Sequence, residues 1–306
     1  MKFSCKVCDK GFSSERSLHA HIKSHDLFLA EYYTKYYPRY NLLTGDVLPF
    51  KNKAQYFGED FSTRDQLIEW CQKESRENVQ NYILELLKKR IESRSLNVGP
   101  SHMELSLNLM PDIEIYQKVF GSYTHACNQA GVEPMFGSRM PDSWYETEVC
   151  DPKIFIDTRE QQPLKFKNFE SMKLDVGDYV TAGEDYNYTY VDRKSEQDFK
   201  STLSKNSLER FRAELERTKS LGAYLFVVTE GSIESIEKNN KWAPHKSSMK
   251  YIYHNMRVLA HEFGGHCQFI FTGSRENSEK IIPKILVLGK EIWGVDLQYY
   301  IDRGKI

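Results

Sequence analysis

Long apolar runs and cysteine pairs that could form disulfides are scarce in this sequence of 306 residues. No apolar run reaches the ~20 residues that a membrane-spanning helix needs, and the N-terminus lacks the apolar core of a signal peptide. Of the six cysteines, only Cys5 and Cys8 lie close together. The other four are scattered, which indicates free thiols in a reducing compartment. We therefore expect an intracellular protein with no membrane partner.

An excess of charge of one sign is also missing. The chain has 42 Lys and Arg residues against 43 Asp and Glu residues, for a net charge of -1. A surface for a polyanion would therefore have to come from basic residues gathered locally. The apolar content of 40% is ordinary for a globular protein, and the length suffices for two or more domains.

Residues 1–26 have the ligand spacing of a small zinc site. Cys5 and Cys8 are followed after twelve residues by His21 and His25. Two thiolates from a hairpin and two histidines from one helix face give the four tetrahedral ligands that Zn2+ requires. Phe3, Phe12 and Leu18 could fill the small core of a metal-dependent fold. The segment resembles the two-cysteine, two-histidine zinc finger, which implies a ββα fold.

The sequence does not decide which kind of molecule this finger binds. In fingers that read DNA, positions near 13–18 face the major groove. Arg16 is the only strong base or phosphate donor among them. DNA, RNA and protein all remain candidate partners.

Residues 27–95 are rich in aromatics and are expected to be partly helical. The aromatic residues of 28–61, with interleaved lysines and arginines, could form a nucleic-acid stacking surface or a small aromatic core. We favour the core. Apolar residues at helical spacing predict further helices near 63–71 and 79–91.

Residues 96–136 show helix-capping patterns. Ser101 and Glu104 fit a capping box, and Ser122 fits the cap of a helix that ends at Gly131. The P-S-x-x-E-L and F-G-S-x-x-x-A-x-x-x-A-G patterns resemble the helical repeat that accompanies many homing endonucleases. The resemblance implies a helical DNA-binding module, although a generic three-helix domain could carry the same caps. Residues 137–150 are expected to be a linker.

The candidate catalytic residues lie in the segment from residue 154 to residue 199. Three strands are expected, over 153–157, 173–179 and 188–194, with a turn at 183–185 between the last two. Asp178 and Asp192 would then lie on neighbouring strands, with Lys194 on the same face as Asp192. Carboxylates hold Mg2+ (or Mn2+), which activates a water, and a lysine can orient that water or stabilise developing charge. This is the acid, acid-x-Lys arrangement of restriction-endonuclease-like phosphodiesterases.

The surrounding residues resemble the XPF-type nuclease domain of the XPF, MUS and Hef enzymes. The resemblance covers D-T-R-E at 157–160, G-D at 177–178 and D-R-K-x-x-x-D at 192–198. It implies an α/β restriction-endonuclease-like core over 151–306. It also implies metal ligands at Asp157, Asp178 and Asp192, with Glu160, Arg193 and Lys194 completing the catalytic set. Asp192 stands where the family usually has glutamate, which puts the position of the metal and the rate in doubt.

Other basic residues give weaker indications of DNA contact. Arg159 could meet a phosphate, and Lys241 and Lys246 belong to a basic loop expected over 238–250. In contrast, Glu209, Glu214 and Glu216 are expected to neutralise the outer face of a helix.

These features predict a Mg2+-dependent DNA endonuclease with a zinc finger and a helical targeting module. A phage or mobile-element (homing-type) nuclease acting on duplex DNA is favoured because of the homing-type repeat. In addition, only residues 289–306 follow the core, too few for the tandem hairpin-helix units with which XPF-type enzymes recognise junctions. The alternatives are a flap or junction nuclease of repair or recombination and a non-catalytic DNA-binding scaffold. Double-strand cleavage by one site requires a homodimer or two successive nicks. The expected location is the cytoplasm or nucleoid of a prokaryotic or phage-infected cell, or a eukaryotic nucleus.

Overall fold

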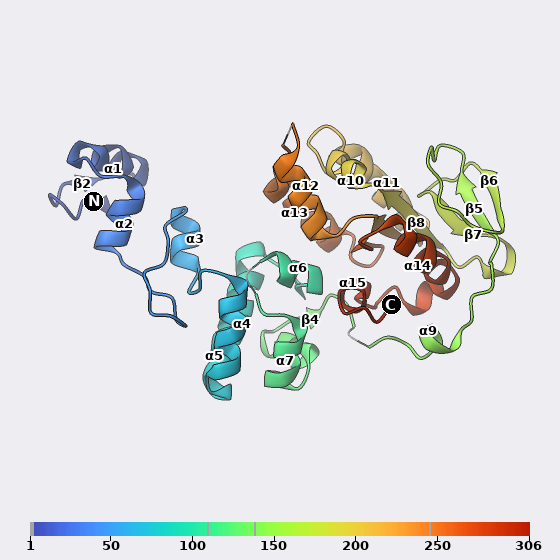
Figure 1. Cartoon of the computed structure of the whole chain (residues 1–306), viewed down its shortest axis with the longest axis horizontal. Helices are drawn as coiled ribbons and strands as arrows, with labels where there is room; N and C mark the ends of the chain where they lie inside the picture. Colours follow the sequence, from blue (N-terminus) through green and yellow to red (C-terminus); the bar gives the residue numbers. More distant parts are fainter. Residues whose placement is uncertain (1–2, 109, 138, 245) are drawn as a thin grey trace. The chain divides into compact units, whose positions relative to one another are not determined.

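The computed structural model describes residues 3–108, 110–137, 139–244 and 246–306 (Figure 1). The chain divides into two compact units, and each is considered by itself. The first comprises Met1–Ile83 with Leu109–Val119, and the second comprises Leu84–Asn108 with Phe120–Ile306. In the described residues, no helix has the length and apolar character needed to cross a membrane.

The first unit begins with the expected ββα finger. Strands β1 (Phe3–Ser4) and β2 (Gly11–Phe12) pair antiparallel, and α1 (Glu15–Ile22) follows. Ser14 caps α1 by accepting a hydrogen bond from the Ser17 amide at 3.2 Å. The short helix η1 (Lys23–His25) then carries the last zinc ligand.

The aromatic residues that follow the finger form a core together with it. Helix α2 (Leu29–Tyr36) buries Tyr32 and Tyr33, and α3 (Lys53–Gly58) buries Tyr56. The Tyr32 hydroxyl accepts a hydrogen bond from the Lys6 amide at 2.9 Å. This confirms the core over the stacking surface and shows that the finger does not fold around its own side chains alone. The shared buried cluster comprises Cys5, Leu18, Ile22, Tyr32, Tyr33, Leu48 and Tyr56.

Three helices complete the first unit. Thr63 caps α4 (Arg64–Lys73), and the N-terminal part of α5 (Arg76–Arg94) and most of α7 (Ile113–Phe120) lie in the same unit. The Arg64 and Arg76 guanidiniums donate hydrogen bonds to the Met110 and Val119 carbonyls at 2.8–3.0 Å. These bonds tie the segment 110–119 to the preceding helices.

The second unit begins with the rest of the helical region. The parallel strands β3 (Val98–Gly99) and β4 (Glu133–Pro134) bracket α6 (His102–Leu107) and α8 (Tyr123–Gln129). Ser101 and Ser122 cap these helices as predicted. The capping box is wrong in one respect: the Glu104 carboxylate binds Arg90 and His261 instead of turning back to the Ser101 amide. The helices are therefore present, and their role in binding DNA stays a prediction.

The segment 137–150, expected to be a linker, packs on the C-terminal part of the same unit. Gly137 exchanges backbone hydrogen bonds with Gly294 and Asp296, and the Met140 amide donates to the Tyr300 hydroxyl at 2.7 Å. Helix α9 (Ser143–Glu146) buries Trp144. The other domain boundaries proposed from the sequence stay predictions.

A mixed sheet of six strands organises the second unit, in the order β10-β9-β8-β7-β5-β6. The β7 strand pairs antiparallel with β5 and β8, and the remaining neighbours are parallel. The strand expected over 173–179 is misplaced: residues 173–178 are irregular, with bends at 175–178, and strand structure begins only at Tyr179. The turn at 183–185 is confirmed as the short helix η2 (Gly183–Asp185). The strands are β5 (Ile154–Asp157), β6 (Phe169–Met172), β7 (Tyr179–Thr181), β8 (Thr189–Lys194), β9 (Tyr224–Thr229) and β10 (Cys267–Phe271).

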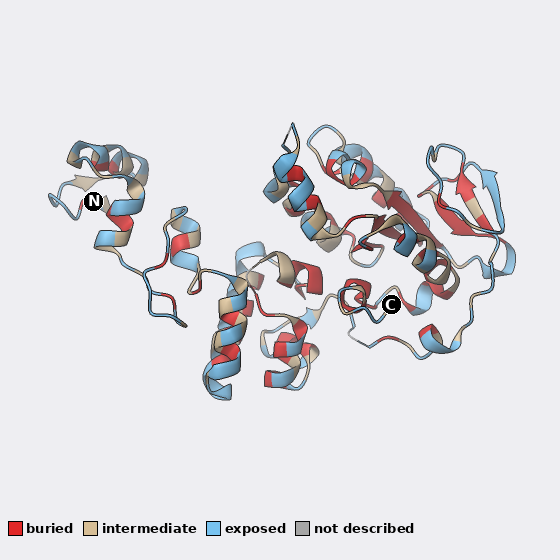
Figure 2. Cartoon of the chain, viewed as in Figure 1, coloured by how far each residue is buried: buried red, intermediate tan, exposed pale blue. Residues whose placement is uncertain are grey.

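Helices cover both faces of this sheet. On one face, α10 (Glu196–Thr202), α11 (Leu208–Ser220) and α13 (Met249–Glu262) pack on alternate residues of β8, β9 and β10. The opposite face receives α14 (Arg275–Leu288) and the ring of Trp293, which stacks on Tyr224 at 5.2 Å. All six residues of β9 are buried, as predicted for a central strand, whereas β6 is exposed at the edge (Figure 2). Helix α12 (Ile233–Trp242), η3 (Gly289–Glu291) and α15 (Leu297–Ile301) complete the unit.

Candidate functional site

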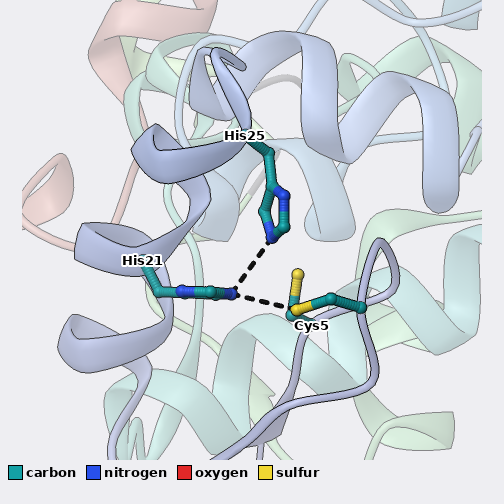
Figure 3. A group of neighbouring side chains, drawn as sticks. Cys5, His21 and His25 are labelled. Carbon is teal, nitrogen blue, oxygen red and sulfur yellow. Dashed lines mark hydrogen bonds between the residues drawn. The ribbon is translucent and has the colours of Figure 1, made fainter.

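The four predicted zinc ligands converge on one point. One ligand atom from each of Cys5, Cys8, His21 and His25 lies within 4.8 Å of the others. The Nε2 atoms of His21 and His25 are 3.1 Å apart (Figure 3). Cys8 Sγ lies 3.2 Å from His21 Nε2. Tetrahedral zinc with Zn–N bonds of ~2.0 Å places two nitrogens roughly 3.3 Å apart, so the donors and their spacing fit Zn2+.

Strand β8 distributes the predicted catalytic residues over two faces of the sheet. Successive side chains of a strand point to opposite faces. Asp192 and Lys194 therefore lie on the face that packs against α11, where Lys194 Nζ lies 5.9 Å from the centre of the Phe211 ring. Arg193 points to the opposite face, which carries α14. The motif thus supplies two separate groups of polar side chains.

Asp178 reaches the face of Asp192 from the turn that precedes β7. Its amide donates to the Val191 carbonyl, and its Oδ2 accepts from the Arg193 amide, both at 2.8 Å. Gly177 makes this turn: its φ is +63°, and a Cβ there would lie 2.9 Å from the Val191 oxygen. A residue with a side chain would be strained in this conformation and would also collide with β8. The glycine before Asp178 is therefore a geometric requirement of the site.

The carboxyls of Asp178 and Asp192 share one buried environment with a single ammonium. Burial raises the pKa of Asp178 well above its usual value, and the neighbouring charge of Asp192 raises it further. Lys194 Nζ donates to Asp192 Oδ1 at 2.6 Å. Burial would lower the Lys194 pKa, but Asp192 and Asp178 outweigh it and raise that pKa. Asp192 Oδ2 is buried and accepts no hydrogen bond from any donor in the described parts of the chain.

Glu214 of α11 joins this group, and the prediction that it lies on the outer face of the helix is wrong. Its Oε1 accepts a hydrogen bond from the Gly177 amide at 3.1 Å. Burial raises the pKa of Glu214, and the charge of Asp192 adds to the rise. The inward position of Glu214 could have been predicted from the sequence. Glu214 follows Phe211 by three residues and precedes Thr218 by four, and both neighbours are buried, so helical spacing puts it on the inner face.

Asp157 is buried at the end of β5, but its carboxylate is occupied by other hydrogen bonds. Its Oδ1 accepts from the Arg159 amide and Nε at 2.7 Å, and its Oδ2 accepts from Arg159 Nη2 and the Leu174 amide. Burial would raise the Asp157 pKa, but these hydrogen bonds, led by Arg159, outweigh it and lower the pKa. The exposed Arg159, considered for phosphate contact, is thus held on Asp157. Within the described residues, only the zinc ligands form a group of three or more side chains at single-ion distance.

Glu160 and Arg193 belong to an ion-pair network on the opposite face. Arg193 contacts Glu160 at 2.9 Å and Glu230 at 3.1 Å, and Arg275 contacts Glu230 at 2.8 Å. The side chains of Arg193 and Glu160 are each only 6% exposed. Burial would lower the Arg193 pKa, but Glu160 and Glu230 outweigh it and raise the pKa. This network fixes β8 to the end of β9.

The remaining candidates for DNA contact are exposed and lie apart from these groups in the chain. Arg16 lies on α1, and Lys246 lies in the loop between α12 and α13. The basic loop is shorter than expected, because α12 continues to Trp242 and includes Lys241. Lys241 Nζ lies 6.0 Å from the ring centre of Trp242, which is 77% exposed. An exposed aromatic beside a cation is a suitable surface for a base or a phosphate.

The donor set on the α11 face fits a divalent cation. Asp192 contacts the Lys194 ammonium, and the charges of Asp178 and Glu214 also act on this group, although the three carboxyls do not lie at single-ion distance in the described residues. The charge of Asp192 contributes to the raised pKa of both Asp178 and Glu214. Oxygen donors of this kind are those preferred by Mg2+ and Mn2+. A bound cation would take up the uncompensated negative charge and the unpaired Asp192 oxygen.

The fold and the two sites together define a zinc-finger protein with an α/β nuclease-type domain. Residues 156–285 match the model of the ERCC4 domain, and residues 2–26 match the model described as "Zinc-finger double-stranded RNA-binding". The chain therefore carries an XPF-type ERCC4 nuclease domain behind an N-terminal Cys2His2 finger. The homing-associated repeat is not matched by either model.

Two solved structures are similar to part of the chain. XPF from Aeropyrum pernix is 18% identical, with a TM-score of 0.34, and the alignment covers 45% of this chain and 67% of that one. Its complex with DNA is also 18% identical, with a TM-score of 0.32, and the alignment covers 44% and 63% of the two chains. No curated protein matches the sequence. The fold assignment therefore depends on the domain model and on the sheet described above.

Proposed function

We propose that this protein is a Mg2+-dependent DNA endonuclease that hydrolyses phosphodiester bonds at the Asp178–Asp192–Lys194 site. One observation carries the proposal: the buried Asp192 contacts Lys194 Nζ at 2.6 Å, and the charges of both act on the partly buried Asp178, within a domain that matches the ERCC4 model. The charge of Asp192 raises the pKa values of both Asp178 and Glu214, so the three carboxylates repel one another in the unbound protein. Such repulsion is expected at a site that binds a divalent cation and a phosphodiester.

The roles of the residues follow from their positions. Asp178 and Asp192 would hold the cation, with Glu214 beside them and Asp157 supporting the end of β5 next to Asp178. When bound, the cation supplies polarisation of the scissile phosphate and a lowered pKa for the attacking water. Lys194 remains protonated, so its ammonium can stabilise the added negative charge of the phosphoryl transition state. Glu160 and Arg193 act as positioning residues that hold β8.

Two substitutions test the site. Asp178→Asn removes a carboxylate of the cation site, and Lys194→Ala removes the ammonium, so each should reduce Mg2+-dependent nicking of plasmid DNA by about 100-fold or more. Glu209→Gln is the matched control, because Glu209 is an exposed carboxylate on the same helix as Glu214. Metal-dependent nicking that persists in both site variants would overturn the assignment. Absence of any nicking in the wild type with Mg2+ or Mn2+ would favour the non-catalytic scaffold.

The finer proposal is a phage or mobile-element (homing-type) nuclease directed to duplex DNA by its N-terminal modules. It is supported by the capped helices α6 and α8, which fit the sequence pattern of the helical repeat. Supercoiled plasmid, flap and Holliday-junction substrates should be compared with Mg2+ and the products mapped. Cuts at a reproducible duplex position support site-directed cleavage, whereas cleavage confined to branched substrates supports the flap or junction alternative.

The finger has a second candidate ligand, because the matched model is described as binding double-stranded RNA. Its exposed Arg16 is a suitable phosphate donor for either duplex. Duplex DNA and duplex RNA of equal length should therefore compete for the zinc-loaded protein. A selective loss of RNA binding in Arg16→Ala would assign the finger to RNA, and an equal loss for both duplexes would assign it to backbone contact.

A further inference from the structure

A groove of about 390 Å³ in the second unit lies outside the candidate nuclease site. One wall is the end of α5 and the loop after it, from Arg90 to Asn97, and the other wall is α13 around Arg257. Glu104 of α6 also lines it. The groove therefore joins the start of the helical region to a helix of the nuclease fold.

The groove has more positive than negative charge. Three arginines and one glutamate line it, which leaves a surplus of two positive charges when its histidines are neutral. The only lining carboxylate is already occupied: Glu104 contacts Arg90 Nη2 at 2.5 Å and His261 Nε2 at 2.7 Å. The lining arginines are Arg90, Arg94 and Arg257, and the lining histidines are His254 and His261.

Two of the arginines have no carboxylate partner. The Arg257 side chain is partly buried and makes no hydrogen bond or ion pair with any described residue. Burial and, second, the charge of Arg90 lower the pKa of Arg257 to about 10, although the charge of Glu104 acts in the opposite direction. Arg94 is exposed, and its one described contact is with His254, at 3.4 Å between Nη1 and Nδ1. Burial and, second, the charge of Arg94 lower the pKa of His254. The contact with His254 therefore gives Arg94 no negative counter-charge.

A cluster of cations that costs free energy in the unbound protein is most readily explained by an anionic ligand. Guanidinium groups bind phosphate oxygens through paired N–H donors. Ser93, Ser95 and Asn97 add neutral hydrogen-bonding groups along the same wall. An open groove with dispersed donors fits an extended polyanion better than a compact metabolite.

We propose that this groove binds the phosphodiester backbone of the nucleic-acid substrate through Arg94 and Arg257, as a second contact apart from the cleavage site. The inference rests on the proposed nuclease function for the identity of the polyanion. Glu104 has a separate role: it holds Arg90 and His261 in place and so fixes the base of the groove. Its position as the third residue of α6 links the helical region to this contact.

The test measures binding without cleavage. Duplex DNA labelled with a fluorophore is titrated with the full-length zinc-loaded protein in Ca2+, at several salt concentrations, by anisotropy. Arg94→Gln combined with Arg257→Gln should weaken binding by roughly 10- to 100-fold and reduce the slope of log K against log salt by about 1.8, which corresponds to two phosphate contacts. The matched control is Arg210→Gln combined with Arg217→Gln, which removes two exposed arginines of α11.

Three further measurements distinguish loss of the groove contact from misfolding, from binding of free phosphate and from failure of the nuclease proposal. The single exposed change Arg94→Glu guards against misfolding of the double variant, and it should weaken binding more than Arg210→Glu does. Inorganic phosphate at millimolar concentration should compete only weakly, because the proposed ligand is a chain of phosphates. Strong competition would assign the groove to a free phosphate-containing metabolite and overturn the proposal, as would groove variants that bind like the control. Wild-type protein that binds DNA through the groove but cleaves no DNA with Mg2+ or Mn2+ would refute the proposed nuclease activity and leave the groove assignment intact.

Discussion

Gly177→Ala should damage this protein in a way that separates two physical effects. The φ of +63° costs a residue with a Cβ about 1–2 kcal/mol. The added Cβ would also lie 2.9 Å from the Val191 oxygen and 3.1 Å from Leu225 Cδ1. Forcing an extra methyl into packed surroundings costs about 1–3 kcal/mol more, so the whole substitution should cost about 2–5 kcal/mol.

Gly183→Ala is the matched control. Its φ is +69°, yet a Cβ there meets nothing within 4 Å. Both substitutions gain the same unfolded-state entropy of about 0.4–1 kcal/mol, which cancels in the comparison. The difference between the two variants therefore isolates the close approach of the Gly177 turn to β8, at about 1–3 kcal/mol.

The assay is thermal unfolding of the full chain together with plasmid nicking. A domain of 150–250 residues loses about 2–4 °C of Tm per kcal/mol, so Gly177→Ala should melt roughly 2–12 °C below Gly183→Ala. Nicking should fall only in Gly177→Ala, because relief of the contact moves the Val191 carbonyl that fixes the Asp178 amide at 2.8 Å. Equal Tm values and equal nicking in the two variants would refute the reasoning.

Further expectations concern the metal sites and the buried charges. Chelation of zinc, or Cys5→Ser, should disorder the finger and also expose Tyr32, which near-UV circular dichroism of the tyrosines would detect; unchanged spectra would contradict a shared core. The folded pKa of Asp178 is raised, so its contribution to stability is full below its unfolded pKa and is lost as pH rises through the folded pKa. In zinc-loaded protein without Mg2+, Asp178→Asn should therefore raise the Tm at neutral pH and not at acid pH. Added Mg2+ should stabilise only the wild type. Arg193→Met leaves Glu160 buried without its partner and should cost about 3–5 kcal/mol, measured by unfolding against Arg210→Met; an equal Tm in the two would argue against a stabilising network.

The sequence alone was sufficient to predict a site where its geometry depends on residues close together in the chain. Cys5 and Cys8 lie on one hairpin and His21 and His25 on consecutive helical turns, so spacing alone fixes which atoms can meet. The same holds for Asp192 and Lys194, which a strand places on one face whatever the surrounding fold. The helix caps at Ser101 and Ser122 could also be predicted from the sequence, because each cap depends on only three or four consecutive residues.

Contacts between distant segments were decided by the tertiary structure. Glu214 enters the acid cluster only because α11 crosses the turn at Gly177, 37 residues earlier in the chain. Asp157 resembles a metal ligand in sequence, yet the Leu174 amide, 17 residues away, donates a hydrogen bond to its Oδ2 in addition to the local contacts of Arg159. Glu104 resembles half of a capping box, yet its carboxylate contacts Arg90 and His261, 14 and 157 residues away in the chain. Sequence spacing determines which side chains share a face, whereas a charged side chain's partner depends on which elements the core brings beside it, and that is settled only when the sheet and its helices pack.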